Sequence, residues 1–328
     1  MRSTSRLTGG WATALLLLSA CGGVKVADQA LPSDLAWPAG DPRVRLERII
    51  AVREGGGVLR SLLGGPQGEP LFERPYGVAW DGDDLLVADP GARKVVRIES
   101  DGHVRAPEEA VVGAPVGVAA CSQGIVATDP EGGRIARLDA DLHVVEWTAE
   151  GLSRPTGVAC RGESLYVVET GAHRLLLFEA DGRRRIVGHR GADQGGFNFP
   201  TTVAIAGGSL LVGDTLNFRV QRIDIETGAA EGVFGRLGDA PGEMPRIKGL
   251  AVDAAGQVWV SDAHTDRVSL YTADGRLLLT LGGRGIDPGR FSFPAGIAAH
   301  PDGRVAVADS FNRRIQVFRI VGGELSRE

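Results

Sequence analysis

The chain has 328 residues, with 36 basic and 41 acidic side chains and a formal net charge of −5 at pH 7. Residues 1–20 contain two arginines and no acid, so the rest of the chain carries −7. This acidic balance argues against indiscriminate binding of nucleic acid, which needs a basic surface. We therefore expect no nucleic-acid partner. Nothing in the sequence implies an obligate oligomer.

The N-terminus has the pattern of an export signal. Residues 1–20 carry the two arginines and then an apolar stretch that is too short to span a bilayer comfortably. The sequence from Leu18 to Cys21 resembles the lipobox of bacterial lipoproteins, which implies that Cys21 becomes the first mature residue and carries lipid such as palmitate. An ordinary signal peptide followed by a chance cysteine is the alternative.

The next segment links this signal to the rest of the chain. Gly22, rather than Asp, follows Cys21, which favours the outer over the inner membrane of a Gram-negative cell envelope. Residues 21–42 are rich in Gly, Pro and Ala and have few strand-forming residues. This composition predicts a flexible tether.

Six copies of one pattern follow, about 40 to 48 residues apart, which indicates a stacked architecture. Each copy has a small-residue entry such as PYGVA, an apolar run that ends in an acid, and a base five residues later. Runs of β-branched residues bounded by Gly, Pro and Asp predict four strands per copy, and Asp-Gly pairs mark hairpin turns. The acids are Asp89, Asp129, Glu169, Asp214, Asp262 and Asp309, and the bases are Lys94, Arg134, Arg174, Arg219, Arg267 and Arg314.

Four-stranded units at this period predict an all-β fold, a six-bladed β-propeller of antiparallel blades. The second run of each copy is apolar at neighbouring positions, as expected for a sheet buried on both faces. The last copy stops after its third strand, and a spare strand at 43–52 precedes the first copy. We expect residues 43–328 to form one domain whose ring is closed by this N-terminal strand.

The copies at 169–178, 214–223 and 309–318 resemble NHL repeats, whose signature is close to P-x-G-V-A, then V-A-D, then N-x-R-V-x-V-F. The chain departs from it at Lys94, Glu169, Thr202 and Ile247. The resemblance implies a propeller and covers nearly the whole mature chain. Similar propellers serve as protein- or RNA-binding platforms, sensor domains, lyases and lactonases, so it implies no single function.

Two patterns raise the question of a metal. The six acids could line a channel mouth and hold calcium, but their regular partner five residues later favours a structural role, in which each acid caps its turn or pairs with the base. His173, His189 and His264 are expected on one rim and could hold zinc, but no two share a short ligand spacing. We expect no metal or cofactor, with calcium or zinc only under an enzymatic reading.

Irregular positions are a better guide to a ligand site. The loops that connect blades are long at 64–75, 188–200, 235–246 and 282–294 and short elsewhere, which predicts an uneven rim. Ordinary rim exposure is the alternative for any single residue on it. The residues expected to contact a ligand are His173, Phe218, His264, Phe311 and Arg313.

Cys121 and Cys160 lie on first strands of adjacent blades, one place apart relative to the repeat glycine. The pleat then sends the two side chains to opposite faces. We expect two buried free thiols, with a disulfide in an oxidising compartment as the alternative.

These observations favour a lipid-anchored, non-enzymatic binding or scaffold module of the bacterial envelope, which recognises a protein or glycan through its loop-rich rim. No catalytic residue is assigned. The alternative is a metal-dependent lyase or lactonase-like enzyme with its site at the channel mouth. A third class, an accessory of secreted redox proteins, is neither supported nor excluded.

Overall fold

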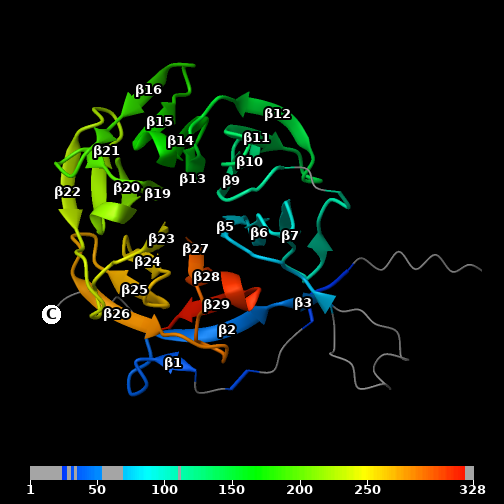
Figure 1. The fold of residues 1–328 in the computed structure, drawn as a ribbon. Coiled ribbons are helices and arrows are strands. Elements are labelled where there is room, and N and C mark those ends of the chain that lie inside the picture. Colours follow the sequence, from blue (N-terminus) through cyan, green and yellow to red (C-terminus); the bar gives the residue numbers. More distant parts are fainter. Residues whose placement is uncertain (1–23, 28–30, 33–34, 54–68, 110–111, 322–328) are drawn as a thin grey trace, which may run out of the picture.

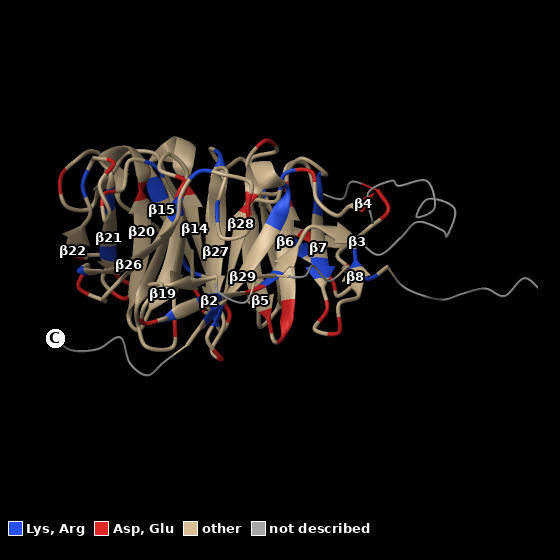
Figure 2. Cartoon of the chain, turned by 90° about the horizontal axis from the view of Figure 1, so that it is seen from below, with Lys and Arg blue, Asp and Glu red and all other residues tan. Residues whose placement is uncertain are grey.

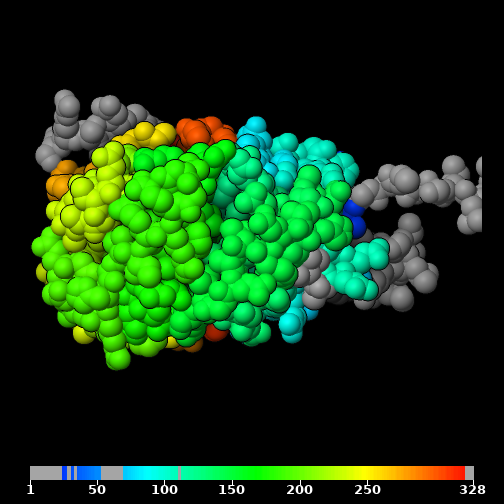
Figure 3. Space-filling view, turned by 90° about the horizontal axis from the view of Figure 1, so that it is seen from above, coloured from blue at the N-terminus to red at the C-terminus, as the bar shows by residue number. Residues whose placement is uncertain are grey.

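The computed structural model describes residues 24–27, 31–32, 35–53, 69–109 and 112–321. Six antiparallel sheets surround a central axis like the blades of a propeller (Figure 1), as the sequence predicts. Seen from the side, the ring of blades is a flat disc, and acidic residues are visible in the loops at both of its rims (Figure 2). Successive blades adjoin in chain order along the outer edge (Figure 3).

Each blade runs from an inner first strand to an outer fourth strand. Blade I contains β5 (Gly77–Asp81), β6 (Asp84–Asp89), β7 (Lys94–Ile98) and β8 (Val104–Arg105). Blade II contains β9 (Val118–Cys121), β10 (Gly124–Asp129), β11 (Arg134–Leu138) and β12 (Val144–Ala149). Blade III contains β13 (Pro155–Arg161), β14 (Ser164–Glu169), β15 (Arg174–Phe178) and β16 (Arg184–Val187).

The other three blades repeat this order. Blade IV contains β19 (Pro200–Ala206), β20 (Ser209–Asp214), β21 (Arg219–Asp224) and β22 (Ala230–Phe234). Blade V contains β23 (Ile247–Val252), β24 (Val258–Asp262), β25 (Arg267–Tyr271) and β26 (Leu277–Gly282). Blade VI contains β27 (Pro294–Ala299), β28 (Arg304–Asp309) and β29 (Arg314–Ile320), and its outer strand comes from the N-terminal side.

That outer strand is β2 (Val44–Ile50), which pairs antiparallel with β29 from Val44 opposite Ile320 to Ile50 opposite Ile315. The predicted closure of the ring by residues 43–52 is therefore confirmed. A short strand, β1 (Ala36–Trp37), adds a fifth strand outside β2. Closure leaves neither end of the blade series with an open face.

Short strands and 3₁₀ helices lie in the loops of the ring. The strands β3 (Val52–Arg53) and β4 (Glu69–Pro70) pair antiparallel, and β17 (His189–Arg190) and β18 (Gly196–Phe197) pair parallel. Three short 3₁₀ helices follow second strands: η1 (Thr170–Ala172), η2 (Thr215–Asn217) and η3 (Ser310–Asn312). Within the described ranges, no helix has the length and hydrophobicity needed to cross a bilayer.

The core is divided into six clusters, one between each pair of neighbouring blades. Second strands contribute to both sides: Val87 packs toward blade VI, whereas Leu86 packs toward blade II. This explains why second strands are apolar at neighbouring positions rather than alternating. Each blade buries two faces, so its stability depends on both neighbours.

Inner strands approach each other too closely for side chains at the repeat glycine. A Cβ atom at Gly77, Gly117, Gly249 or Gly296 would overlap a carbonyl oxygen of the next blade. Only glycine fits such a close backbone approach. The predicted small-residue entry is thus a consequence of crowding around the axis.

Blade IV departs from this rule at Thr202, which stands where the other copies have glycine. Thr202 pairs across the sheet with Gly213, and a Cβ on Gly213 would overlap the Thr202 side chain. The glycine has therefore moved from the first strand of the blade, β19, to the opposite position in the second strand, β20. The departure preserves the packing of the repeat.

Part of the segment predicted to be a flexible tether, residues 24–27, is paired with blade I. The backbone N–H of Val26 donates to Gly102 O at 2.9 Å, and that of Val104 donates to Val24 O at 2.7 Å. Val26 is buried in the cluster between blades VI and I. Because β8 has only two residues, blade I leaves an open outer edge, which residues 24–27 cover. The predicted signal peptide and Cys21 lie outside the described residues.

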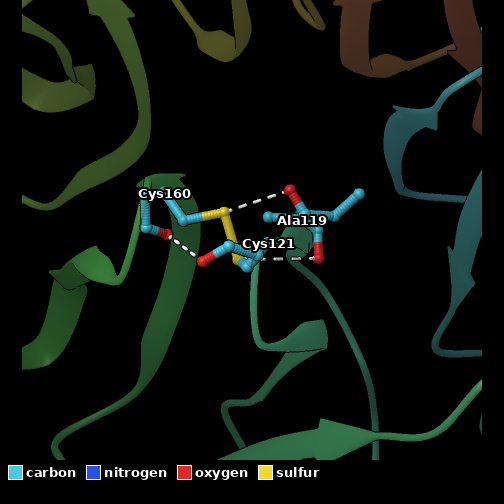
Figure 4. Close-up of a disulfide and its surroundings, with 6 residues drawn as sticks. Ala119, Cys121 and Cys160 are labelled. Atoms are coloured by element: carbon cyan, nitrogen blue, oxygen red, sulfur yellow. Dashed lines mark hydrogen bonds between the residues drawn. A yellow bond between two sulfur atoms is a disulfide. The ribbon is translucent and has the colours of Figure 1, made fainter.

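Cys121 and Cys160 form a disulfide, with a Cα–Cα distance of 5.7 Å, between blades II and III (Figure 4). The expectation of two free thiols is therefore wrong. The two side chains do leave opposite faces of their own sheets, but neighbouring blades contact each other through opposite faces. Both cysteines pack against the single cluster between blades II and III.

We predict that Ile49→Ala destabilises the whole ring. Ile49 lies in β2 and is buried in the cluster between blades V and VI, and truncation of such a side chain leaves a cavity. The expected loss in free energy of unfolding is about 3 kcal/mol, measured by denaturant titration. Arg45→Ala, an exposed change on the same strand, should cost less than about 0.5 kcal/mol. Equal losses for both variants would contradict a sealing role for β2.

Candidate functional site

The repeat acids fasten the loop that enters each blade. Each is buried at the end of its second strand and accepts a hydrogen bond from a backbone N–H some 16 residues earlier. The carboxylate oxygens are therefore already engaged in hydrogen bonds that hold the loops in place. The pairs are Asp89 with Glu73 and Arg74, Asp129 with Ala114, Glu169 with Ser153, Asp214 with Asn198, Asp262 with Arg246, and Asp309 with Ser292.

Four of the bases five residues later complete this clamp. The Nε atoms of Arg134, Arg174, Arg219 and Arg314 donate to their acids at 2.6 to 3.2 Å. The other two reach loop carbonyls instead: Lys94 Nζ donates to Glu108 O, and Arg267 Nη1 donates to Asp239 O. The acids are buried within the blades, so they offer no ring of ligands at the channel mouth.

The residue before each base has a left-handed backbone in every blade. Its φ lies between 53° and 62°. The irregular side chains at this position therefore sit on a uniform backbone, and only one blade uses glycine there. The six residues are Arg93, Gly133, His173, Phe218, Asp266 and Arg313.

The five residues expected to contact a ligand lie in blades III to VI and do not converge. His173 is buried, accepts a hydrogen bond at Nδ1 from Phe199 N at 3.1 Å, and packs edge-on against the Phe199 ring. It therefore positions the loop that enters blade IV. Arg313 Nε donates to Phe72 O at 2.9 Å, which ties blade VI to the loop before blade I.

The other candidates are more accessible. His264 is exposed, with Nε2 3.5 Å from Asp239 Oδ1. Phe218 is half-buried. Phe311 is 61% exposed and stacks on Phe293, with ring centroids 4.7 Å apart. Of the five, Phe311 presents the largest free apolar surface to a partner.

Phe311 belongs to a set of apolar side chains on the loop-rich rim, the rim formed by the blade-connecting loops and the turns between second and third strands. The set spans blades IV to VI, and we call it the rim patch. Each member lies in a different loop or turn of this rim, and exposed apolar side chains on one face are candidates for contact with a partner. Its members are Leu216, Leu237, Ile286 and Phe311.

A cavity of about 90 Å³ lies on the axis, where first strands begin at the loop-rich rim. The residue before the repeat glycine lines it in five blades, and these residues are Tyr76, Val116, Thr156, Thr201 and Lys248. No Asp, Glu, His or Cys is among the described residues that line it. These are the side chains that most often hold a divalent cation in proteins, so the side chains at the channel mouth fit a metal poorly.

Lys248 is the exceptional residue of this cavity. Burial, and then the positive fields of Arg246 and Arg154, lower the pKa of Lys248 to about 8, against an opposing effect of Asp262. Among the described residues, no hydrogen bond or ion pair engages its ammonium group. A partly desolvated cation without a partner is costly, and groups with perturbed pKa values cluster at functional sites.

Tyr76 faces the same electrostatic environment from blade I. Burial raises the pKa of Tyr76 to about 12, while Arg154 and Arg246 act in the opposite direction. Its hydroxyl is therefore a neutral donor at physiological pH. The hydroxyls on the other side serve the fold: those of Thr156 and Thr201 bond to the hydroxyls of Thr170 and Thr215, both at 2.7 Å.

The sequence prediction missed Lys248, although a signal was present. Lysine interrupts a small-residue entry at IKGLA, and the whole chain has only three lysines. The predicted trio of His173, His189 and His264 does not converge, since each has its own loop partner. Two His–carboxylate clusters lie on the opposite rim instead, around His300 and His103. Asp83 and Asp302 already pair with Arg304, and Glu99 pairs with Arg105, whereas Asp101 pairs with His103.

The fold defines the chain as a six-bladed β-propeller. Residues 291–318 match the family model of the NHL repeat, so blade VI carries an NHL repeat, as its sequence suggests. No curated protein matches the chain in sequence.

Solved structures with the same fold have diverse functions. A gluconolactonase from Xanthomonas campestris has 17% identity and a TM-score of 0.61, with 92% of this chain and 96% of that chain covered. Virginiamycin B lyase from Staphylococcus aureus, solved as an inactive variant with quinupristin, has 16% identity and a TM-score of 0.54, with 76% and 95% covered. A chain of a nidogen/laminin complex has 16% identity and a TM-score of 0.57, with 74% and 89% covered. At these identities the likeness shows the fold alone.

We predict that Lys248→Met stabilises the protein near neutral pH, by up to about 3 kcal/mol in free energy of unfolding. The folded-state pKa lies below the unfolded value, so the unfolded chain binds more protons between about pH 8 and 10.5. The destabilisation by Lys248 is complete below pH 8 and fades as the pH rises to 10.5.

The measurement is the free energy of unfolding of wild type and variant across this pH range. The gain from Lys248→Met should shrink at alkaline pH, whereas Lys94→Met, which removes a lysine hydrogen-bonded to a loop carbonyl, should show no such trend. A loss of stability in Lys248→Met at neutral pH would show that the ammonium group is well accommodated.

Proposed function

We propose that this protein is a non-enzymatic binding module of the bacterial envelope, anchored through lipid on Cys21, that captures an envelope protein or glycan through its loop-rich rim. The observation that carries the proposal is the exposed Phe311 of the rim patch, which is linked through Phe293 to Arg246, two residues before the cavity residue Lys248. Phe311 stacks on Phe293, and the guanidinium of Arg246 lies 5.9 Å from the centroid of the Phe293 ring. Apolar anchors beside charged donors are the usual composition of a recognition surface.

Two observations support export. The first 21 residues have the pattern of a lipoprotein signal, and the Cys121–Cys160 disulfide is of a kind that persists in oxidising compartments. Gly22 favours the outer membrane. Lipid on Cys21 would supply the contact with the bilayer.

The alternative, a metal-dependent lyase or lactonase, has less support. Two structural neighbours carry such names, but they share only the fold at these identities. The cavity on the axis presents Lys248 and Tyr76, and the described residues that line it include no carboxylate or imidazole. These groups bind negative charge rather than a metal ion.

We predict that Cys21→Ala moves the protein from the membrane fraction to the soluble fraction of the cell. The unfolding temperature of the soluble domain should stay the same, because position 21 precedes the paired residues of the ring. The measurement is fractionation followed by immunoblotting, with a transmembrane protein and a soluble periplasmic protein as markers. A variant that stays in the membrane fraction would argue against lipidation.

We predict that the rim patch contacts the partner directly. A photo-crosslinking amino acid at position 311 should trap that partner in living cells, and mass spectrometry should identify it. The same amino acid at position 145, which is similarly exposed on the outer strand β12, is the matched control. Crosslinks of equal yield and identity at both positions, or none at 311, would refute a role for this rim.

A further inference from the structure

We propose that the channel mouth is a binding site for one oxyanion, a carboxylate or phosphate group of the partner, held by Lys248, Arg154 and Arg246 with Tyr76 as an additional donor. This inference rests on the proposed function, because it names the chemistry that the rim recognises. No metal is required at the site.

The repeat itself brings the three cations together. Arg154 and Arg246 occupy equivalent positions in blades III and V, two residues before the cavity residues Thr156 and Lys248. Both arginines are exposed at the rim, whereas Lys248 lies deeper. Their fields act on both Lys248 and Tyr76. The four groups therefore share one electrostatic environment, although they come from three blades.

No carboxylate in the described part of the chain pairs with these cations. Other bases of the ring pair with carboxylates, such as Arg314 with Asp309 or Arg97 with Asp84. No ion pair among the described residues engages the side chains of Arg154, Arg246 or Lys248. The ring contact of Arg246 with Phe293 leaves the N–H groups of the guanidinium available.

The inventory of donors and acceptors selects for an anion. Lysine and arginine side chains offer only donors, and a neutral tyrosine hydroxyl adds another. Hydrogen bonds from charged donors to carboxylate or phosphate are among the strongest in proteins. A neutral ligand would leave these charges unpaired, and a cation would be repelled. The mouth is thus basic although the chain as a whole is acidic.

The size of the cavity limits what can enter. About 90 Å³ accommodates a small group but not a sugar ring with its substituents or a peptide. The oxyanion must therefore be a terminal or projecting group, while the body of the partner lies on the rim. Phe293 connects Arg246 with Phe311 of the rim patch, and the body of the partner would rest there.

The scarcity of lysine permits a direct test. The intact protein is treated with limiting acetic anhydride near pH 8, and acetylation of Lys25, Lys94 and Lys248 is quantified by peptide mass spectrometry. Lys248 should react fastest, because half of its amines are unprotonated at that pH. Inorganic phosphate or acetate at ten times its dissociation constant should slow Lys248 by about tenfold. Lys25 and Lys94 serve as internal controls and should not change.

Each arm has a defined outcome. Protection by phosphate alone, or by acetate alone, supports the site and identifies the group that it takes. Arg154→Ala and Arg246→Ala should each weaken this protection, whereas Arg190→Ala, which removes an exposed arginine from the same rim, should not. Lack of protection by either anion, or equal protection by chloride at matched ionic strength, would overturn the inference.

A second readout separates this inference from the proposed function. The crosslinking experiment at position 311 is repeated with Lys248→Met in the same chain. Loss of capture in this folded variant supports the oxyanion site. Undiminished capture would overturn the oxyanion site and leave the binding function intact, whereas no capture in the parent chain would refute the function itself.

Discussion

Every blade of this propeller is apolar on both faces, and the rest of the structure depends on that constraint. A sheet of this kind cannot terminate a stack, because its outer face would return apolar surface to water. The six clusters are complete only because β2 finishes the last blade and the first blade packs against it. Closure in turn crowds the inner strands, which is why the position beside the axis is glycine in most blades.

The scaffold could be predicted from sequence because its signals are local. An acid five residues before a base, an Asp-Gly pair and a small-residue entry each specify a turn or a strand end with little help from distant residues. The missing outer strand of the last copy and the spare strand before the first copy were equally visible. The covering of blade I by residues 24–27 was not, because it depends on the shortness of β8 in the folded ring.

The disulfide could not be predicted from the pattern of a single strand. Alternation along a strand correctly sends Cys121 and Cys160 to opposite faces of their sheets. Whether they meet depends on which faces touch, and this is a property of the ring rather than of any strand. Lys248 is similar: the sequence shows a lysine in an unusual place, but its burial and the fields of Arg154 and Arg246 arise only when three blades are assembled. Positions that follow the repeat form the scaffold, whereas Lys248, at the centre of the proposed site, departs from the repeat.

The pairing of residues 24–27 with blade I has a geometric consequence for an acylated protein. Val24 lies three residues after Cys21, which is at most about 10 Å of extended chain. A lipid on that cysteine would keep the outer edge of the disc, at blade I, close to the bilayer.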